Sequence, residues 1–154
     1  MQRRDFLATI ASTGALSVLD PAYLAAKEAW AAGKASEQQV PRQRYGRHNE
    51  ELSIIGFGGI TVTEVTLKEA TSFVAEAVDR GINYFDVAPT YGNAQERLGP
   101  ALEPYRQRCF LACKTTQRDA AGSAKELEQS LKMLQTDHVD LYQFHALTKL
   151  PGVL

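Results

Sequence analysis

Residues 54–59 read IIGFGG, an apolar run that contains three glycines, and Ile60-Thr61 follow it. A short apolar run of this kind is typical of a buried strand. In a doubly wound nucleotide-binding sheet, the motif G-x-G-x-x-G usually follows the first strand directly and opens a helix. Here no third glycine follows Gly56 and Gly58 at the required position, and a helical pattern begins only near Thr66. The stretch therefore favours an α/β fold of the TIM (β/α)8-barrel type, with a doubly wound sheet as the alternative.

Downstream of this stretch, short apolar runs alternate with helical patterns. The first helical pattern carries a capping box, Thr66 with Glu69, and a glycine at its C-terminal end, Gly81. Further apolar runs occupy residues 84–87, 109–114 and 139–144. Strands joined by helices imply a parallel sheet. A complete barrel needs eight such units in about 250 residues, and this sequence supplies about four.

Two more helices are predicted between these runs. We expect Asn93 with Glu96 to cap the helix after the second run, and Ser123 with Glu126 to open the helix after the third. Upstream, residues 44–54 have the pattern of a small β-hairpin.

The first 32 residues predict an export signal. The pair Arg3-Arg4 precedes an apolar stretch at residues 6–19, and residues 29–31 (AWA) offer a cleavage site. The paired arginines resemble the twin-arginine type of bacterial signal, which implies export to the periplasm by the twin-arginine machinery. An amphipathic helix or a membrane anchor is the alternative, but an anchor needs about 20 apolar residues. The expected divisions are a signal at residues 1–32, a polar linker at 33–43 and a barrel segment at 44–154.

The composition excludes several classes of partner. The 17 basic and 18 acidic side chains give a net charge of −1, so the chain has no electrostatic signature for nucleic acid or an anionic membrane. Cys109 and Cys113 lie in one predicted strand, about 13 Å apart at ~3.3 Å per residue, which is too far for a disulfide. No ligands with tetrahedral spacing lie nearby, so we predict packing cysteines and no metal site.

Four polar residues fall at the C-terminal ends of the predicted strands, where parallel α/β folds collect their chemistry. Asp86 ends the second run, and Tyr91 lies in the loop beyond it. Lys114 ends the third run, and His145 follows the fourth. Taken singly, each residue is more typical of a turn, a strand end or a satisfied core side chain.

Together, these four side chains can protonate a carbonyl oxygen. A phenol is by itself a weak acid at neutral pH, and a nearby lysine ammonium favours the phenolate. A carboxylate keeps the lysine charged, and a histidine can donate to charge that develops on the oxygen. No side chain delivers hydride, so a nicotinamide or similar cofactor is implied.

The sequence around these residues resembles the aldo/keto reductase family. Residues 81–88 (GINYFDVA), followed by Tyr91-Gly92, are similar to the family signature around its catalytic aspartate and tyrosine. Residues 111–115 (LACKT) resemble the strand that carries its lysine. Residues 131–137 (LKMLQTD) and 140–145 (DLYQFH) are similar to the segment that leads to its histidine. The motifs follow one another in the order and spacing of the family.

The resemblance implies an enzyme that reduces aldehydes or ketones to alcohols with NADPH or NADH, on a barrel without a Rossmann domain. It implies that Tyr91 is the general acid and that Lys114 makes it more acidic. It further implies that Asp86 pairs with Lys114 and that His145 positions the carbonyl of a small-molecule substrate.

The resemblance also implies cofactor contacts. They come from Gly59 and Ile60, in the turn after the first strand, and from Asp86; Gly59 replaces a threonine that is common in the family. Residues 142–147 (YQFHAL) also resemble a branch whose members can carry an iron–sulfur tail, for which this sequence holds no ligands.

After Leu147 the sequence continues only as TKLPGVL, so the last four strands that the family uses for cofactor binding are missing from it. We therefore expect a truncated barrel that self-associates through exposed strand edges. The alternative is that the chain is an inactive remnant or a non-catalytic binding module. The presence of all four site residues argues against this alternative.

Overall fold

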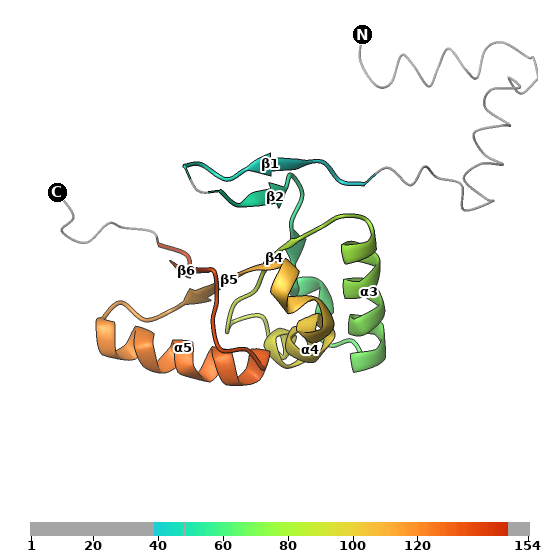
Figure 1. Cartoon of the computed structure of the whole chain (residues 1–154). Coiled ribbons are helices and arrows are strands. Elements are labelled where there is room, and N and C mark those ends of the chain that lie inside the picture. Colours follow the sequence, from blue (N-terminus) through green and yellow to red (C-terminus); the bar gives the residue numbers. More distant parts are fainter. Residues whose placement is uncertain (1–38, 48, 148–154) are drawn as a thin grey trace, which may run out of the picture. The chain divides into compact units, whose positions relative to one another are not determined.

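The computed structural model describes residues 39–47 and 49–147 of the 154-residue chain. The predicted export signal and the linker up to residue 38 lie outside these residues. Within the described part, an antiparallel hairpin precedes a four-stranded parallel sheet with three α-helices (Figure 1).

The four apolar runs form the sheet in the order in which they occur in the sequence. The strands are β3 (Phe57–Gly58), β4 (Tyr84–Asp86), β5 (Phe110–Thr115) and β6 (Leu141–Phe144). Each strand pairs with the next in parallel. The predicted parallel sheet is confirmed, and its four strands with three intervening helices form part of a (β/α)8 barrel.

Strand β3 is shorter than predicted. Of residues 54–59, only Phe57 and Gly58 pair in the sheet. The Ile54 amide donates to the Pro41 carbonyl at 2.9 Å, so Ile54 continues the hairpin, and its side chain is exposed. An apolar run in the sequence does not show at which residue the chain leaves the hairpin and begins to pair with the parallel sheet.

Three α-helices lie on the same side of the sheet (Figure 1). They are α3 (Leu67–Asp79), α4 (Ala94–Leu102) and α5 (Ala120–Leu134), and the 3-10 helices η1 (Gly59–Val62) and η2 (Glu103–Arg108) follow β3 and α4. The core between them and the sheet is apolar and includes the fully buried side chains of Val74, Phe85, Leu98, Leu102 and Leu111. Each such side chain stabilises the fold by about 1.5–3 kcal/mol, which makes this layer the main source of stability.

Helix α3 begins and ends as its sequence predicts. The Glu69 amide donates to Thr66 Oγ1, and the Thr66 amide donates to the Glu69 carboxylate at 2.8 Å. Gly81 follows the helix and has a φ of +90°, a backbone conformation that would be strained for any residue with a side chain.

The predicted caps are confirmed in part for α4 and are wrong for α5. Asn93 is the N-cap residue of α4, as predicted, but its side chain makes no cap hydrogen bond; its Oδ1 accepts from the Glu64 amide at 2.9 Å. Helix α5 begins at Ala120 with Asp119 as its N-cap, so the Ser123–Glu126 pair lies inside the helix. Both errors arise because a polar side chain with several nearby donors takes the partner that the tertiary fold brings closest.

The predicted hairpin is confirmed, and it lies against the N-terminal ends of the parallel strands. Strands β1 (Arg42–Arg44) and β2 (Glu51–Ser53) pair in antiparallel fashion. The Ser53 amide donates to Asn83 Oδ1 at 2.7 Å just before β4, and the rings of Tyr45 and Phe110 lie 6.0 Å apart. Arg42 and Gln43, within the segment expected to be a linker, are part of this hairpin.

Both cysteines are free and buried, as expected. Burial raises the pKa of each thiol, which keeps both protonated at neutral pH and fits a packing role. None of the described helices is long and apolar enough to span a membrane.

Candidate active site

The structure brings the four predicted residues together at the C-terminal end of the sheet. Asp86 is the last residue of β4, Lys114 is the next to last of β5, and His145 directly follows β6. Tyr91 lies in the loop between β4 and α4. Because the strands are parallel neighbours, these side chains share one edge of the sheet.

Lys114 and Asp86 form an ion pair. Lys114 Nζ donates to Asp86 Oδ1 and also lies 3.4 Å from the carbonyl oxygen of Val87. The side chains of Lys114 and Asp86 are 14% and 26% exposed, so the pair is largely shielded from water. An ammonium held in this way is fixed in position.

Tyr91 lies beside this ammonium. Lys114 Nζ is 5.2 Å from the centre of the Tyr91 ring, within cation–π distance. The backbone of Tyr91 is held by hydrogen bonds on both sides, since its amide donates to the Ala88 carbonyl and its carbonyl accepts from Thr63 Oγ1 at 3.0 Å. The phenol ring is therefore presented by a loop anchored to the turn after β3.

His145 completes the cluster from β6. Its ring meets the Tyr91 ring edge-on, with centres 5.7 Å apart and an interplanar angle of 90°. Its amide donates to the Thr115 carbonyl at 2.9 Å, which continues the β5–β6 ladder. Thr90 Oγ1 lies 3.1 Å from His145 Nδ1.

Two charged residues hold the loop after β5: Arg118, which was not predicted from the sequence, and Glu126, which was predicted only as part of a helix start. The Arg118 guanidinium donates to the His145 carbonyl at 2.6 Å and lies 5.5 Å from the Phe144 ring centre. The Glu126 carboxylate accepts from the hydroxyls of Thr115 and Thr116 at 2.6 and 2.8 Å. Only the hydroxyl pair Thr115-Thr116 at the strand end could have drawn attention to this loop in the sequence.

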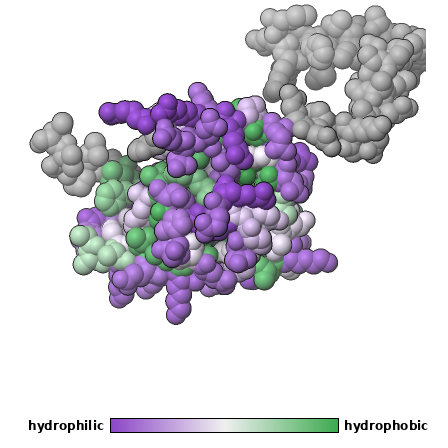
Figure 2. Space-filling model, in the orientation of Figure 1, coloured by the Kyte–Doolittle hydropathy of each residue, from purple (hydrophilic) through white to green (hydrophobic). Residues whose placement is uncertain are grey.

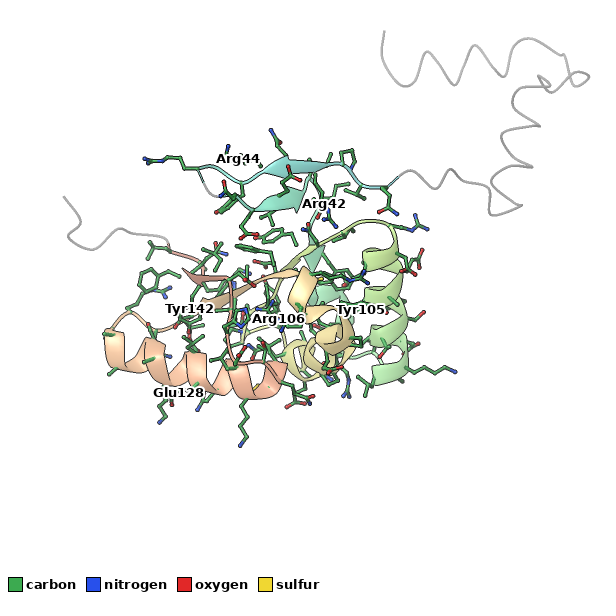
Figure 3. All side chains as sticks on the ribbon, in the orientation of Figure 1. Arg42, Arg44, Tyr105, Arg106, Glu128 and Tyr142 are labelled. Atoms are coloured by element: carbon green, nitrogen blue, oxygen red, sulfur yellow. The ribbon has the colours of Figure 1, made fainter. Side chains whose placement is uncertain are left out.

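A third residue missed from the sequence ties the opposite end of β5 to β6. In Figure 3, Arg106 lies in the middle of the molecule, and its guanidinium donates to the Asp140 carboxylate at 2.9 Å and to the Cys109 carbonyl at 2.8 Å. These contacts tie together the chain segments that lead into β5, which carries Lys114, and into β6, which His145 directly follows.

The two expected cofactor residues of the first turn differ in exposure. Gly59 is buried, and a Cβ there would come within 2.9 Å of the Asp86 carbonyl oxygen and 3.0 Å of a Val87 methyl carbon. The side chain of Ile60 is 59% exposed. The described residues contain no group of three or more His, Cys, Asp or Glu side chains that could hold a metal.

The aldo/keto reductase family model matches residues 54–149 of the sequence, which contain all four clustered side chains. The chain belongs to the aldo/keto reductase family. Members of this family are oxidoreductases, and their general activity is the NAD(P)H-dependent reduction of carbonyl groups.

Curated aldo/keto reductase relatives match the chain over part of their length. The aldo-keto reductase YhdN of Bacillus subtilis is 37% identical over 92 residues, which cover 51% of this chain and 28% of YhdN. L-galactose dehydrogenase of Arabidopsis thaliana is 31% identical over 122 residues, which cover 70% of this chain and 38% of the dehydrogenase.

Solved aldo-keto reductases have the same arrangement of elements. A putative member from Pseudomonas aeruginosa superposes with a TM-score of 0.66 at 30% identity, over 71% of this chain and 48% of that one. A Klebsiella pneumoniae reductase in complex with NADPH gives a TM-score of 0.64 at 26% identity, over 73% and 41%. This aldo/keto reductase chain thus spans less than half the length of these two solved relatives.

Proposed function

We propose that this chain carries the proton-transfer residues of an NADPH- or NADH-dependent enzyme that reduces aldehydes or ketones to alcohols. The observation that supports the proposal most strongly is the position of Lys114 Nζ, which bonds to Asp86 and lies 5.2 Å from the Tyr91 ring centre. A shielded ammonium that bonds to a carboxylate and lies beside a phenol ring is placed to stabilise the phenolate that remains after proton transfer.

In the proposed mechanism, the Tyr91 hydroxyl gives its proton to the carbonyl oxygen of the substrate. The Lys114 ammonium stabilises the phenolate that remains, and the Asp86 carboxylate keeps Lys114 charged and in place. An N–H of the His145 ring donates to the same carbonyl oxygen as negative charge develops on it. The nicotinamide cofactor, when bound, supplies the hydride for the carbonyl carbon.

We propose that Gly59, Ile60 and Asp86 contact the nicotinamide end of the cofactor. The close packing of Gly59 on the end of β4 supports this, because it leaves no room for a side chain and brings the turn next to Asp86. The exposed side chain of Ile60 is available for an apolar contact with a ring. The paired arginines near the N-terminus support a further proposal, that the protein acts in the periplasm.

The test uses a chimera in which the remaining strands come from a solved relative such as the Klebsiella pneumoniae reductase. Tyr91→Phe should lower kcat for aldehyde reduction about a hundred- to ten-thousand-fold, because the proton donor is lost. Lys114→Met should act in the same direction. Both are measured by NADPH oxidation under steady-state conditions.

Tyr105→Phe and Lys132→Met are the matched controls. Tyr105 lies in η2 and packs on the core, and Lys132 is exposed on α5 (Figure 3 labels Tyr105). Both should retain full activity. If Tyr91→Phe keeps most of the activity of the parent chimera, Tyr91 is not the general acid.

A further inference from the structure

The ring of His145 has a hydroxyl group beside one of its two nitrogens. Thr90 Oγ1 lies 3.1 Å from Nδ1, although the two residues are 55 positions apart in the sequence. Thr90 directly precedes Tyr91, so one loop brings both the phenol and this hydroxyl to the histidine.

The backbone of His145 is fixed independently of the ring. Its amide donates to the Thr115 carbonyl at 2.9 Å, and its carbonyl accepts from the Arg118 guanidinium at 2.6 Å. With the main chain held at both ends, the remaining freedom lies in the side-chain torsions and in the choice of which ring nitrogen carries the proton.

A neutral imidazole has one N–H donor and one bare nitrogen that accepts, and the hydrogen bond at one nitrogen decides the role of the other. If the Thr90 hydroxyl donates to Nδ1, the proton is on Nε2, which can then donate to a carbonyl oxygen. If Nδ1–H donates to Thr90, Nε2 presents a lone pair that repels a carbonyl oxygen. Only the first arrangement stabilises charge that develops on the substrate oxygen.

We infer that Thr90 is a positioning residue, whose hydroxyl donates to Nδ1 and holds neutral His145 in the Nε2–H tautomer toward the substrate carbonyl. The inference rests on the proposed role of His145 in carbonyl reduction. It adds a residue that acts through His145 and does not itself touch the substrate.

The chain contains an internal reference for this tautomer. His138 Nδ1 lies 2.6 Å from Asp137 Oδ1. The hydrogen bond from His138 lowers the pKa of the Asp137 carboxyl, so at neutral pH this oxygen can only accept. His138 must therefore carry a proton on Nδ1, and the two histidines should show opposite patterns in one spectrum.

The test is long-range ¹H–¹⁵N correlation NMR of the 154-residue chain with labelled histidine, in a His48→Gln background. Spectra are recorded at about pH 8.5, about two units above the ordinary imidazole pKa of ~6.5. We expect a bare, hydrogen-bonded Nδ1 at His145 and a protonated Nδ1 at His138. Thr90→Val keeps the shape of the side chain and removes the hydroxyl. It should change the ¹⁵N chemical shift of His145 Nδ1 to that of a bare imidazole nitrogen that accepts no hydrogen bond.

Thr90→Ser should restore the parent spectrum, since it returns the hydroxyl. The control is Thr71→Val, because Thr71 is exposed on α3 and its hydroxyl donates to the Leu67 carbonyl of the same helix. It should leave His145 unchanged. A proton on Nδ1 of His145 in the parent chain, or a Thr90→Val spectrum identical to the parent, overturns the inference.

A kinetic measurement on the chimera separates this inference from the proposed function. Thr90→Val should lower kcat about five- to tenfold with little change in KM. A loss of this size is expected when the hydrogen bond from His145 to the substrate oxygen is weakened in the transition state. If Tyr91→Phe leaves activity intact, the proposed function fails, while the spectra still decide whether Thr90 sets the tautomer of His145.

Discussion

At the scale of single residues, the end of strand β5 is held by a carboxylate from the helix that follows it. Glu126 in α5 accepts hydrogen bonds from the Thr115 hydroxyl and from the amide and hydroxyl of Thr116. These groups end β5, directly after Lys114. Partial burial raises the pKa of the Glu126 carboxyl, but the hydrogen bonds from Thr115, Thr116 and Gln117 together outweigh it, so the pKa lies below its ordinary value.

Glu126→Gln should therefore destabilise the chain by about 1 kcal/mol, because the amide replaces a charged acceptor. The difference in free energy of unfolding between the parent and this variant should be fully present above about pH 4.3, the ordinary pKa of a glutamate side chain. It should be lost as the pH falls through the lower pKa of the folded state. Urea unfolding at a series of pH values measures this.

Glu128→Gln is the control, since Glu128 is exposed on the same helix and is labelled in Figure 3. It should change stability little at any pH. If the stability difference between Glu126→Gln and the parent stays constant down to strongly acidic pH, the ionised carboxylate is not the source of that difference.

At the scale of elements, the packing of α4 on α5 depends on the absence of one side chain. A Cβ on Gly99 of α4 would lie 2.6 Å from the carbonyl carbon and oxygen of Leu134, the last residue of α5. Backbone atoms cannot move aside as a flexible side chain can. The C-terminal end of α5 therefore rests directly on α4.

Gly99→Ala should destabilise the chain by about 1–3 kcal/mol through overpacking. The gain of up to ~1 kcal/mol in helix propensity is smaller than this cost. Thermal unfolding followed by circular dichroism measures the difference. Gly58→Ala is the control, because a Cβ there meets no atom within 4 Å. An unchanged or raised Tm for Gly99→Ala would contradict the close contact.

At the scale of the whole molecule, the parallel sheet in the described residues has two edges, β3 and β6. Large apolar side chains are exposed near them, with 59% of Ile60 and 54% of Phe144 accessible. Figure 2 shows hydrophobic surface between the largely hydrophilic outer faces of the hairpin and the helices. Unpaired edges with exposed apolar groups favour association with other chains.

Produced as the 154-residue chain, the protein should therefore be dimeric or larger and should bind NADPH weakly. Gel filtration and a fluorescence titration with NADPH measure the two properties. The chimera with a relative's remaining strands serves as the control and should be monomeric with restored binding. A stable monomer with micromolar affinity for NADPH would contradict this expectation.

The proposed export signal is tested on the intact N-terminus. A reporter fused to the chain should reach the periplasm, and replacing both Arg3 and Arg4 with lysine should keep it in the cytoplasm. Cell fractionation measures its location. The double variant Arg42→Lys, Arg44→Lys in the hairpin is the matched control and should be exported. Export that is unaffected by the change at Arg3 and Arg4 would reject the twin-arginine route.

Features that depend on neighbours along the chain can be predicted from the amino-acid sequence. The alternation of apolar runs with helical patterns predicted the parallel sheet, and Thr66 with Glu69 predicted the start of α3. Because parallel strands bring their C-terminal ends to one edge, the positions of Asp86, Lys114 and His145 at strand ends were enough to predict that they meet.

Which partner each polar side chain takes depends on the folded arrangement of the chain. Asn93 and Glu126 have the spacing of helix caps, yet Asn93 accepts from Glu64 and Glu126 from Thr115 and Thr116. The contact of Thr90 with His145 likewise joins loops 55 residues apart. The physical reason is that a side chain with several possible partners bonds to the group that the fold places within about 3 Å, a distance that spacing along the chain does not encode.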